Sequence, residues 1–133
     1  MADINWVEFW PKKSNGKSTF DTDKEPPSFM NYCLIGTKGS YTDWHIDLGG
    51  TSVWYHIHRG KKIFILVEPS EANLKLYTEY DKRSDENSWQ GFVEFCTWKG
   101  VDCHPQILTL IEGSTVFIPS GWIHCVFTPE GIY

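Results

Sequence analysis

The hydrophobic positions of this chain form short runs that are typical of β-strands. From residue 31 onward, β-branched and aromatic residues recur in these runs, and Gly, Pro, Ser or Asp ends each one. Because many short strands separated by turn signals are typical of antiparallel barrels and jelly rolls, we expect a mostly β fold of that kind. The expected strands are residues 32–36, 42–47, 51–58, 62–67, 107–111, 115–118 and 123–127.

Helical signals are fewer than strand signals. Ser70 can cap a helix over residues 71–80, in which Leu74 and Tyr77 stand at helical spacing. Residues 89–98 fit a strand or a helix equally well. We therefore expect one helix between the strands and leave the second segment open.

The length and composition restrict the domain count and the kinds of partner. The 133 residues suffice for a single domain, with an N-terminal flanking segment over 1–30 and a β core over 31–129. The net charge of −5 gives no attraction to nucleic acid, so we expect no direct nucleic-acid binding. No apolar stretch reaches transmembrane length, so we expect no membrane partner. The four cysteines form no C-x-x-C pair, which favours free thiols in a reducing intracellular compartment.

Two distant segments carry the residue types of a metal site. His45 and Asp47 stand two apart in an expected strand, so their side chains would project from the same face. Far along the chain, His124 follows a turn signal at Pro119 and Gly121. Two imidazoles and one carboxylate are the ligands of a facial-triad Fe(II) site, which keeps positions open for a cosubstrate and O2. An H-x-D pair is also common by chance, so on the residues alone the metal site and a structural role stay equally open.

Three further histidines need an interpretation. His56 and His58 also share one strand face, and an H-x-H pair can bind a metal. Only one face of their strand can point into a barrel, and we expect Tyr55 to point inward and both histidines outward. His104, beside Pro105 in a polar loop, is expected on the surface.

Longer motifs around these residues resemble a known family. Residues 41–56 read YTDWHIDLGGTSVWYH, residues 60–64 read GKKIF, and residues 118–124 read IPSGWIH. Residues 6–11, with Trp6 and Trp10-Pro11, are similar to the segment that leads into that family's core. These motifs closely resemble the JmjC-domain lysine demethylases, and among them the F-box-linked and PHD-finger-linked histone demethylases. The resemblance extends over most of the chain.

The resemblance implies a fold and a set of site residues. The fold is a double-stranded β-helix, the jelly-roll core of the cupin-like JmjC domains, with a few flanking helices. The cofactor is Fe(II), and the cosubstrates are 2-oxoglutarate and O2. The residues at the matching positions are His45, Asp47 and His124 for the metal and catalysis, and Thr42, Lys62 and Tyr55 for 2-oxoglutarate.

The resemblance also implies an activity and a partner. The reaction is oxidative decarboxylation of 2-oxoglutarate coupled to removal of an N-methyl group from lysine. The partner is a methylated histone tail peptide, and the location is the nucleus. Two alternatives remain, a JmjC protein hydroxylase and a catalytically silent JmjC module that binds chromatin.

The chain departs from the family pattern in a few places. Trp44 and Leu48 stand where the family commonly has Phe, and both remain apolar. We expect Trp44, Trp54 and Trp122 to pack around the metal site. The chain is shorter than the domains of the family, so we expect a β-helix truncated at both ends.

Overall fold

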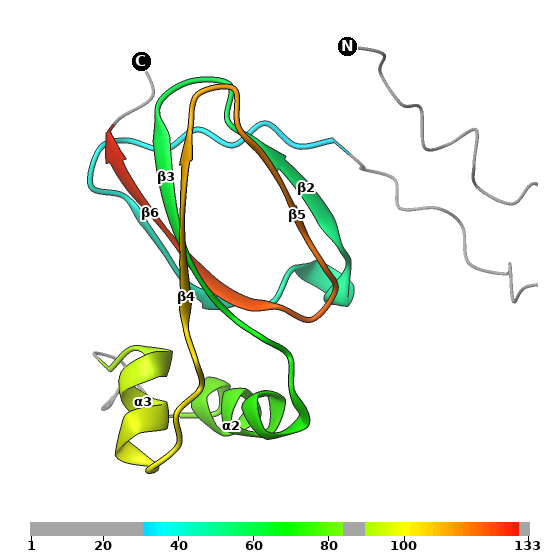
Figure 1. Ribbon diagram of the computed structural model, residues 1–133, viewed down its shortest axis with the longest axis vertical. Helices are drawn as coiled ribbons and strands as arrows, with labels where there is room; N and C mark the ends of the chain where they lie inside the picture. Colours follow the sequence, from blue (N-terminus) through cyan, green and yellow to red (C-terminus); the bar gives the residue numbers. More distant parts are fainter. Residues whose placement is uncertain (1–30, 84–89, 131–133) are drawn as a thin grey trace, which may run out of the picture. The chain divides into compact units, whose positions relative to one another are not determined.

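The computed structural model describes residues 31–83 and 90–130. The chain divides into two units, Met1–Leu34 and Ile35–Tyr133, and every element described below lies in the second (Figure 1). In chain order the elements are β1 (Tyr41–His45), the short 3₁₀ helix η1 (Leu48–Gly50), β2 (Val53–His56), β3 (Lys61–Val67), α2 (Glu71–Asp81), α3 (Phe92–Trp98), β4 (Gln106–Ile111), β5 (Thr115–Ile118) and β6 (Ile123–Glu130).

The strands form two antiparallel sheets. The larger sheet has four strands in the order β1-β6-β3-β4, and the smaller sheet pairs β2 with β5. The expectation of a mostly β, antiparallel fold is therefore confirmed. None of the described helices is long and apolar enough to cross a membrane.

The alternation of side chains along each strand separates two hydrophobic clusters. One cluster lies between the sheets and joins Phe64 of β3 and Val126 of β6 to Ile118 of β5. The opposite face of the larger sheet carries Val67 and Cys125, which belong to a second cluster shared with the helices. The larger sheet thus packs against the smaller sheet on one face. Part of its opposite face joins the helical cluster, and other residues of that face, such as Ile107 and Ile111, are exposed.

The helices α2 and α3 lie together at one end of the sheets (Figure 1). Phe92 of α3 is fully buried, and its ring packs edge-on against the rings of Trp44, Tyr77 and Tyr80. This packing explains why residues 89–98, which fit a strand or a helix by pattern, contain a helix.

Several expected strand boundaries differ from the observed ones. Residues 32–36 form no strand, since they have no ladder partner among the described residues. The strand expected over 42–47 ends at His45, and the one expected over 51–58 is reduced to Val53–His56. The last strand continues to Glu130, three residues beyond the expected end.

The cysteines are free, as expected. Cys96, Cys103 and Cys125 are buried, and Cys33 is exposed. Burial raises the pKa of the Cys96 thiol to about 12, which keeps it protonated at neutral pH.

Helix α2 begins where the sequence predicts. The side chain of Ser70 accepts a hydrogen bond of 3.2 Å from the backbone N–H of Asn73, which satisfies one of the free donors of the first turn. We expect Ser70→Ala to lower the free energy of unfolding by about 1 kcal/mol, measured by urea denaturation. Ser70→Asp, which keeps an acceptor at the cap, should restore most of this loss, and a Ser70→Ala variant as stable as the wild type would contradict the capping role.

Candidate metal centre

His45 is placed by the pairing of β1 with β6. It is the last residue of β1 and lies directly opposite His124 in the ladder. The ladder shifts register between Thr42 and His45, so these two residues share a face although they are an odd number of positions apart. The shift thus turns His45 toward the inner face of the larger sheet, where His124 also lies.

Asp47 lies beyond the end of β1, which corrects the expectation that it shares a strand with His45. It precedes the 3₁₀ turn, in which Gly49 and Gly50 have φ angles of +68° and +65°. These left-handed angles favour glycine. The N–H of Gly50 donates to the carbonyl of Asp47 at 2.8 Å, and the hydroxyl of Ser120 donates to the carbonyl of Gly50. The turn, held to the loop before β6, returns the Asp47 carboxylate toward the two imidazoles.

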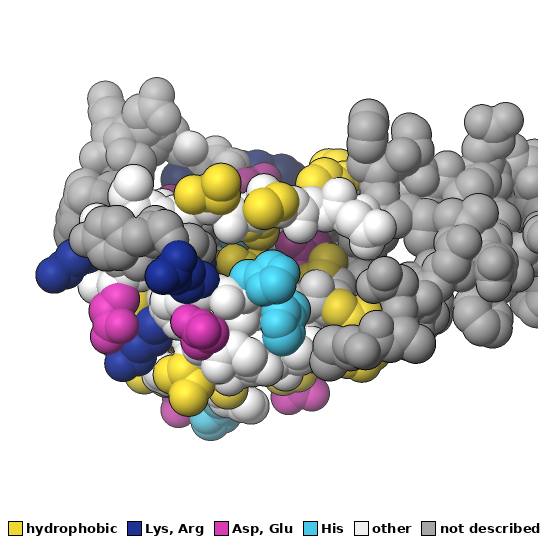
Figure 2. Space-filling view, turned by 90° about the horizontal axis from the view of Figure 1, so that it is seen from above, with side chains coloured by type: hydrophobic (Ala, Val, Ile, Leu, Met, Phe, Trp, Pro, Cys, Tyr) yellow, Lys and Arg dark blue, Asp and Glu magenta, His cyan; other side chains and the backbone are white. Residues whose placement is uncertain are grey.

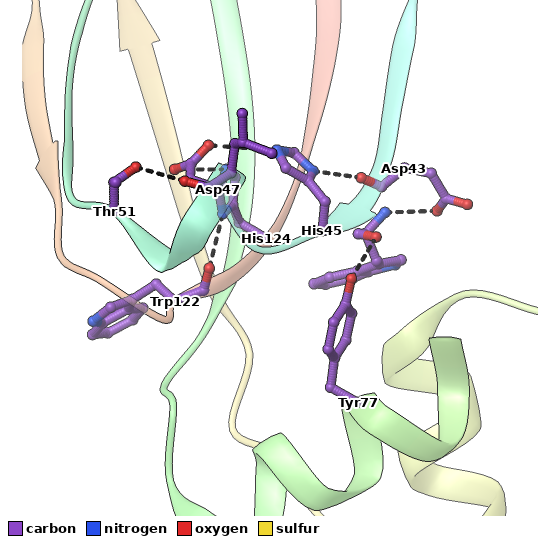
Figure 3. Close-up of polar contacts among 9 residues, drawn as sticks. Asp43, His45, Asp47, Thr51, Tyr77, Trp122 and His124 are labelled. Carbon is purple, nitrogen blue, oxygen red and sulfur yellow. Dashed lines mark hydrogen bonds and ion pairs between the residues drawn. The ribbon is translucent and has the colours of Figure 1, made fainter. Parts of the chain in front are cut away.

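The three side chains converge on one point (Figure 3). The Nε2 atoms of His45 and His124 each lie 3.9 Å from an oxygen of Asp47, one from each carboxylate oxygen. One ligand atom from each residue lies within 4.8 Å of the others. Among the described residues, no other group of three or more His, Cys, Asp or Glu side chains is arranged in this way.

Backbone carbonyls fix the proton on each imidazole. Nδ1 of His45 lies 2.7 Å from the carbonyl of Asp43, and Nδ1 of His124 lies 3.0 Å from the carbonyl of Trp122. A carbonyl can only accept, so each Nδ1 carries the proton and each Nε2 keeps its lone pair. This arrangement turns the Nε2 atom of each imidazole toward the position where a metal would bind.

Burial and charge differ across the three residues. The side chain of His124 is only 3% exposed, whereas those of His45 and Asp47 are 34% and 24% exposed. Burial, together with the neighbouring His45, lowers the pKa of His124, which keeps this ring neutral as metal ligation requires. The site therefore has a buried side at His124 and an open side at the other two residues, where further ligands can enter.

Helix α2 supports the backbone of this site from the opposite face of the sheet. The hydroxyl of Tyr77 donates to the carbonyl of Trp44 at 3.2 Å, next to His45 (Figure 3). The side chain of Asp43 accepts a 2.8 Å bond from the N–H of Trp44. Trp44 itself packs into the helical cluster and is 8% exposed. The residue immediately before the first histidine is thereby held through its carbonyl, its N–H and its side chain.

Lys62 of β3 projects from the inner face of the larger sheet, beyond the triad. It is 8% exposed, and its Nζ donates a 2.6 Å hydrogen bond to the hydroxyl of Thr128. Burial lowers its pKa. Lys62 stands four residues before Leu66 on β3, and Leu66 pairs with His124 of β6. The backbone position of Lys62 is therefore about 13 Å along the strand from the level of His124.

Thr42 lies on the larger sheet between the levels of His124 and Lys62, and Tyr55 lies across from it on the smaller sheet. Thr42 is exposed, and its ladder partner Val126 lies between His124 and the end of β6, so Thr42 shares the inner face. Tyr55 projects inward from β2, and its ring packs edge-on against that of Phe64 with centroids 5.1 Å apart. Burial raises the pKa of Tyr55.

The other expected positions have mixed outcomes. His56 and His58 are exposed, as predicted, and histidine side chains are visible on the end of the molecule opposite the helices (Figure 2). The side chain of His104 is 84% exposed, also as predicted. Trp54 was expected to pack around the metal site, and this was wrong, because it lies on the outer face of β2 with 62% exposure beside Phe117.

The sequence reasoning missed two hydroxyl residues near Lys62. Thr128 is 1% exposed and accepts hydrogen bonds from both Lys62 and Ser40. The signal for Thr128 was present, because it stands at an even spacing from His124 and therefore shares its strand face. Ser40 precedes β1, and no local pattern indicates where it lies.

Comparison with known proteins identifies the class of domain. The JmjC family, described as "JmjC domain, hydroxylase", matches residues 32–130. The chain is 44% identical over 129 residues to Histone lysine demethylase PHF8 of Danio rerio, covering 95% of this chain and 11% of that protein. It is 44% identical over 134 aligned residues to Lysine-specific demethylase 2B of Mus musculus, covering 95% of this chain and 10% of that protein. JmjC domain-containing histone demethylation protein 1 of Caenorhabditis elegans is 40% identical over 126 residues, covering 94% and 11%.

The chain belongs to the JmjC domain family, because the family matches well over half of its residues. The relatives include one protein named as a histone lysine demethylase, PHF8, and one named as a lysine-specific demethylase, 2B. The chain spans about a tenth of the length of these curated relatives.

Proposed function

We propose that this chain is the core of an Fe(II)- and 2-oxoglutarate-dependent dioxygenase. The observation that carries the proposal is the convergence of His45, Asp47 and His124, with both Nε2 lone pairs free. Two imidazoles and one carboxylate suit Fe(II) and leave coordination positions for the 2-oxo acid group and O2. His45, Asp47 and His124 would hold the metal, and the partial exposure of the first two leaves an open side for these ligands.

The distal carboxylate of 2-oxoglutarate would bind at Lys62, with Thr42 and Tyr55 beside it. A buried ammonium gives a charge-assisted grip on a carboxylate, and a hydroxyl adds a hydrogen bond. Thr42 lies on the inner face between the metal row and Lys62, and Tyr55 lies across from it on the smaller sheet. A five-carbon diacid held by its 2-oxo end at the metal would extend along this face toward Lys62.

The proposed reaction removes an N-methyl group from lysine in a histone tail. Bound Fe(II) supplies the activation of O2, with two electrons from decarboxylation of 2-oxoglutarate to succinate and CO2. One oxygen atom of O2 would go to succinate, and the other would convert the N-methyl group to N-hydroxymethyl. The C–N bond of that group would then break to release formaldehyde, with its hydroxyl proton passing to the amine. His45, Asp47 and His124 would hold the metal, Lys62 would anchor the cosubstrate, and the backbone carbonyls of Asp43 and Trp122 orient the two imidazoles.

The substrate and setting are proposed from the relatives. PHF8 and demethylase 2B are named as lysine demethylases, and the first is named for histones. We propose a methylated histone tail peptide as partner and the nucleus as location. We further propose that the two sheets belong to a double-stranded β-helix over residues 31–129, with 1–30 as a flanking segment.

A second candidate function is protein hydroxylation. The matched family is itself described as a hydroxylase, and the same metal and cosubstrate would serve both reactions. The difference lies in which carbon is oxidised, because a hydroxylated N-methyl group collapses to formaldehyde whereas a hydroxylated side-chain carbon is stable.

Mass spectrometry of peptide products separates these functions. The purified chain is incubated with Fe(II), 2-oxoglutarate and a panel of methylated histone peptides, with 2-oxoglutarate omitted as the control. The proposal expects loss of a methyl group with release of formaldehyde. Gain of one oxygen without methyl loss would favour the hydroxylase. Neither product, from a protein that binds Mn(II) and 2-oxoglutarate, would favour a catalytically silent chromatin-binding module.

A further inference from the structure

The ammonium of Lys62 lies in a polar cradle formed with Gly36, Ser40 and Thr128. Its bond to the Thr128 hydroxyl is 2.6 Å long, and the Ser40 hydroxyl donates to the same Thr128 oxygen at 3.0 Å. Lys62 and Thr128 are 8% and 1% exposed. The cradle is therefore a buried group of one cation and two hydroxyls.

The cradle lacks a negative charge. Within residues 31–83 and 90–130, Lys62 forms no ion pair with a carboxylate. A buried ammonium without a counter-charge is unfavourable, which agrees with the lowered pKa of Lys62. Two of its three N–H donors are left over after the bond to Thr128. A carboxylate would supply both the charge and the acceptors.

The Thr128 hydroxyl has a donor to spare. Its oxygen already accepts from Lys62 and Ser40, which occupies both lone pairs. Its own hydrogen is then free to donate to an anion beside the ammonium. Ser40 thus has a positioning role. Because Ser40 and Lys62 both donate to the Thr128 oxygen, the hydrogen of the Thr128 hydroxyl points away from both of them.

The backbone fixes this arrangement. The N–H of Gly39 donates to the carbonyl of Thr128 at 2.8 Å, and the N–H of Thr128 donates to the carbonyl of Ser40 at 2.9 Å. These bonds attach the turn before β1 to β6, next to the Thr128 hydroxyl. A Cβ atom on Gly36 would lie 2.7 Å from Lys62 Nζ and 3.1 Å from Thr128 Oγ1, so only a glycine leaves the ammonium in place.

We propose that Thr128 binds the cosubstrate: its hydroxyl, oriented by Ser40, donates to the distal carboxylate of 2-oxoglutarate beside Lys62. The inference rests on the proposed function of this site. It makes the Thr128 hydroxyl a determinant of the preference for a 2-oxo diacid over a 2-oxo monoacid. A residue with only a structural role would affect both acids equally.

Calorimetric titration of the Mn(II)-loaded full chain tests this, with 2-oxoglutarate and 2-oxobutyrate as ligands. Loss of a hydrogen bond to a charged group should raise the Kd for 2-oxoglutarate about tenfold or more in Thr128→Val. The Kd for 2-oxobutyrate, which lacks the distal carboxylate, should stay within about twofold, on the same principle. Thr128→Ser should keep the wild-type preference, and Thr109→Val, an exposed position on β4, serves as the matched control.

A second variant guards against loss of folding in the first. Ser40→Ala, which removes the hydrogen bond that orients the Thr128 hydroxyl and leaves Lys62 in place, should lower the preference for 2-oxoglutarate, while Mn(II) affinity is unchanged. Unchanged preference in either folded variant, or equal weakening of both acids, would overturn the role of Thr128. A wild-type chain that binds Mn(II) but neither acid would overturn the proposed function itself, and with it this inference.

Discussion

Replacement of Asp47 by Ala is expected to abolish metal-dependent turnover, with a loss of more than about 100-fold. Asp47 supplies the only carboxylate of the triad, and its two oxygens face the Nε2 atoms of both histidines at 3.9 Å. Without this charge, two imidazoles would remain as the only protein ligands from the triad. Turnover is measured as formaldehyde release from a methylated histone peptide, and Mn(II) binding is measured by calorimetry.

The matched control is Asp102→Ala. The Asp102 side chain is 72% exposed, and it pairs with His104 in the loop before β4, outside the triad. This variant should keep wild-type turnover and Mn(II) affinity. Retained Mn(II) affinity or turnover in Asp47→Ala would remove this residue from the metal site.

Replacement of Lys62 by Met is expected to raise the 2-oxoglutarate requirement more than about tenfold without a change in Mn(II) affinity. Met has a similar length and fits the buried position, so the change removes the charge and its hydrogen bonds with little change in volume. The concentration of 2-oxoglutarate for half-maximal turnover is the measurement. Lys61→Met, the adjacent lysine, which pairs with Ile111 of β4, is the control. An unchanged requirement in Lys62→Met would exclude Lys62 from the cosubstrate site.

The same variant predicts a pH dependence of stability. Because burial lowers the pKa of Lys62 below 10.5, the folded chain binds fewer protons than the unfolded chain between the folded pKa and 10.5. The free energy of unfolding of the wild type should therefore rise with pH through this interval, relative to Lys62→Met. Below the folded pKa the buried ammonium is fully charged and its penalty is complete. Urea denaturation at a series of pH values measures the difference, and parallel curves would contradict it.

The β-strands were predictable where the pattern alternates and a partner exists. The strand over Thr115–Ile118 has the predicted bounds, and β3 and β4 each begin one residue earlier than expected. Residues 32–36 also have a strand-like composition but form no strand, because a strand needs a ladder partner and composition does not supply one. The helix α3 depends on the burial of Phe92, a tertiary effect that a local pattern does not contain.

The three residues of the candidate metal site were identified from residue types and motifs, but their arrangement was only partly predicted. The strand rule placed His45 and Asp47 on one face, whereas the structure brings them together through a register shift and a glycine turn. Thr128 and Ser40 were missed because the cradle joins segments 88 positions apart. Such contacts depend on sheet topology, which the sequence pattern does not specify.

The most direct test of the account is the thermal stability of the purified chain with Mn(II) in place of Fe(II), with and without 2-oxoglutarate. A ligand that binds only the folded state raises the midpoint by mass action. We expect the midpoint to rise with Mn(II), to rise further when 2-oxoglutarate is added, and to change with neither ligand in His124→Ala. A folded wild-type chain whose midpoint changes with neither ligand would contradict a working metal and cosubstrate site.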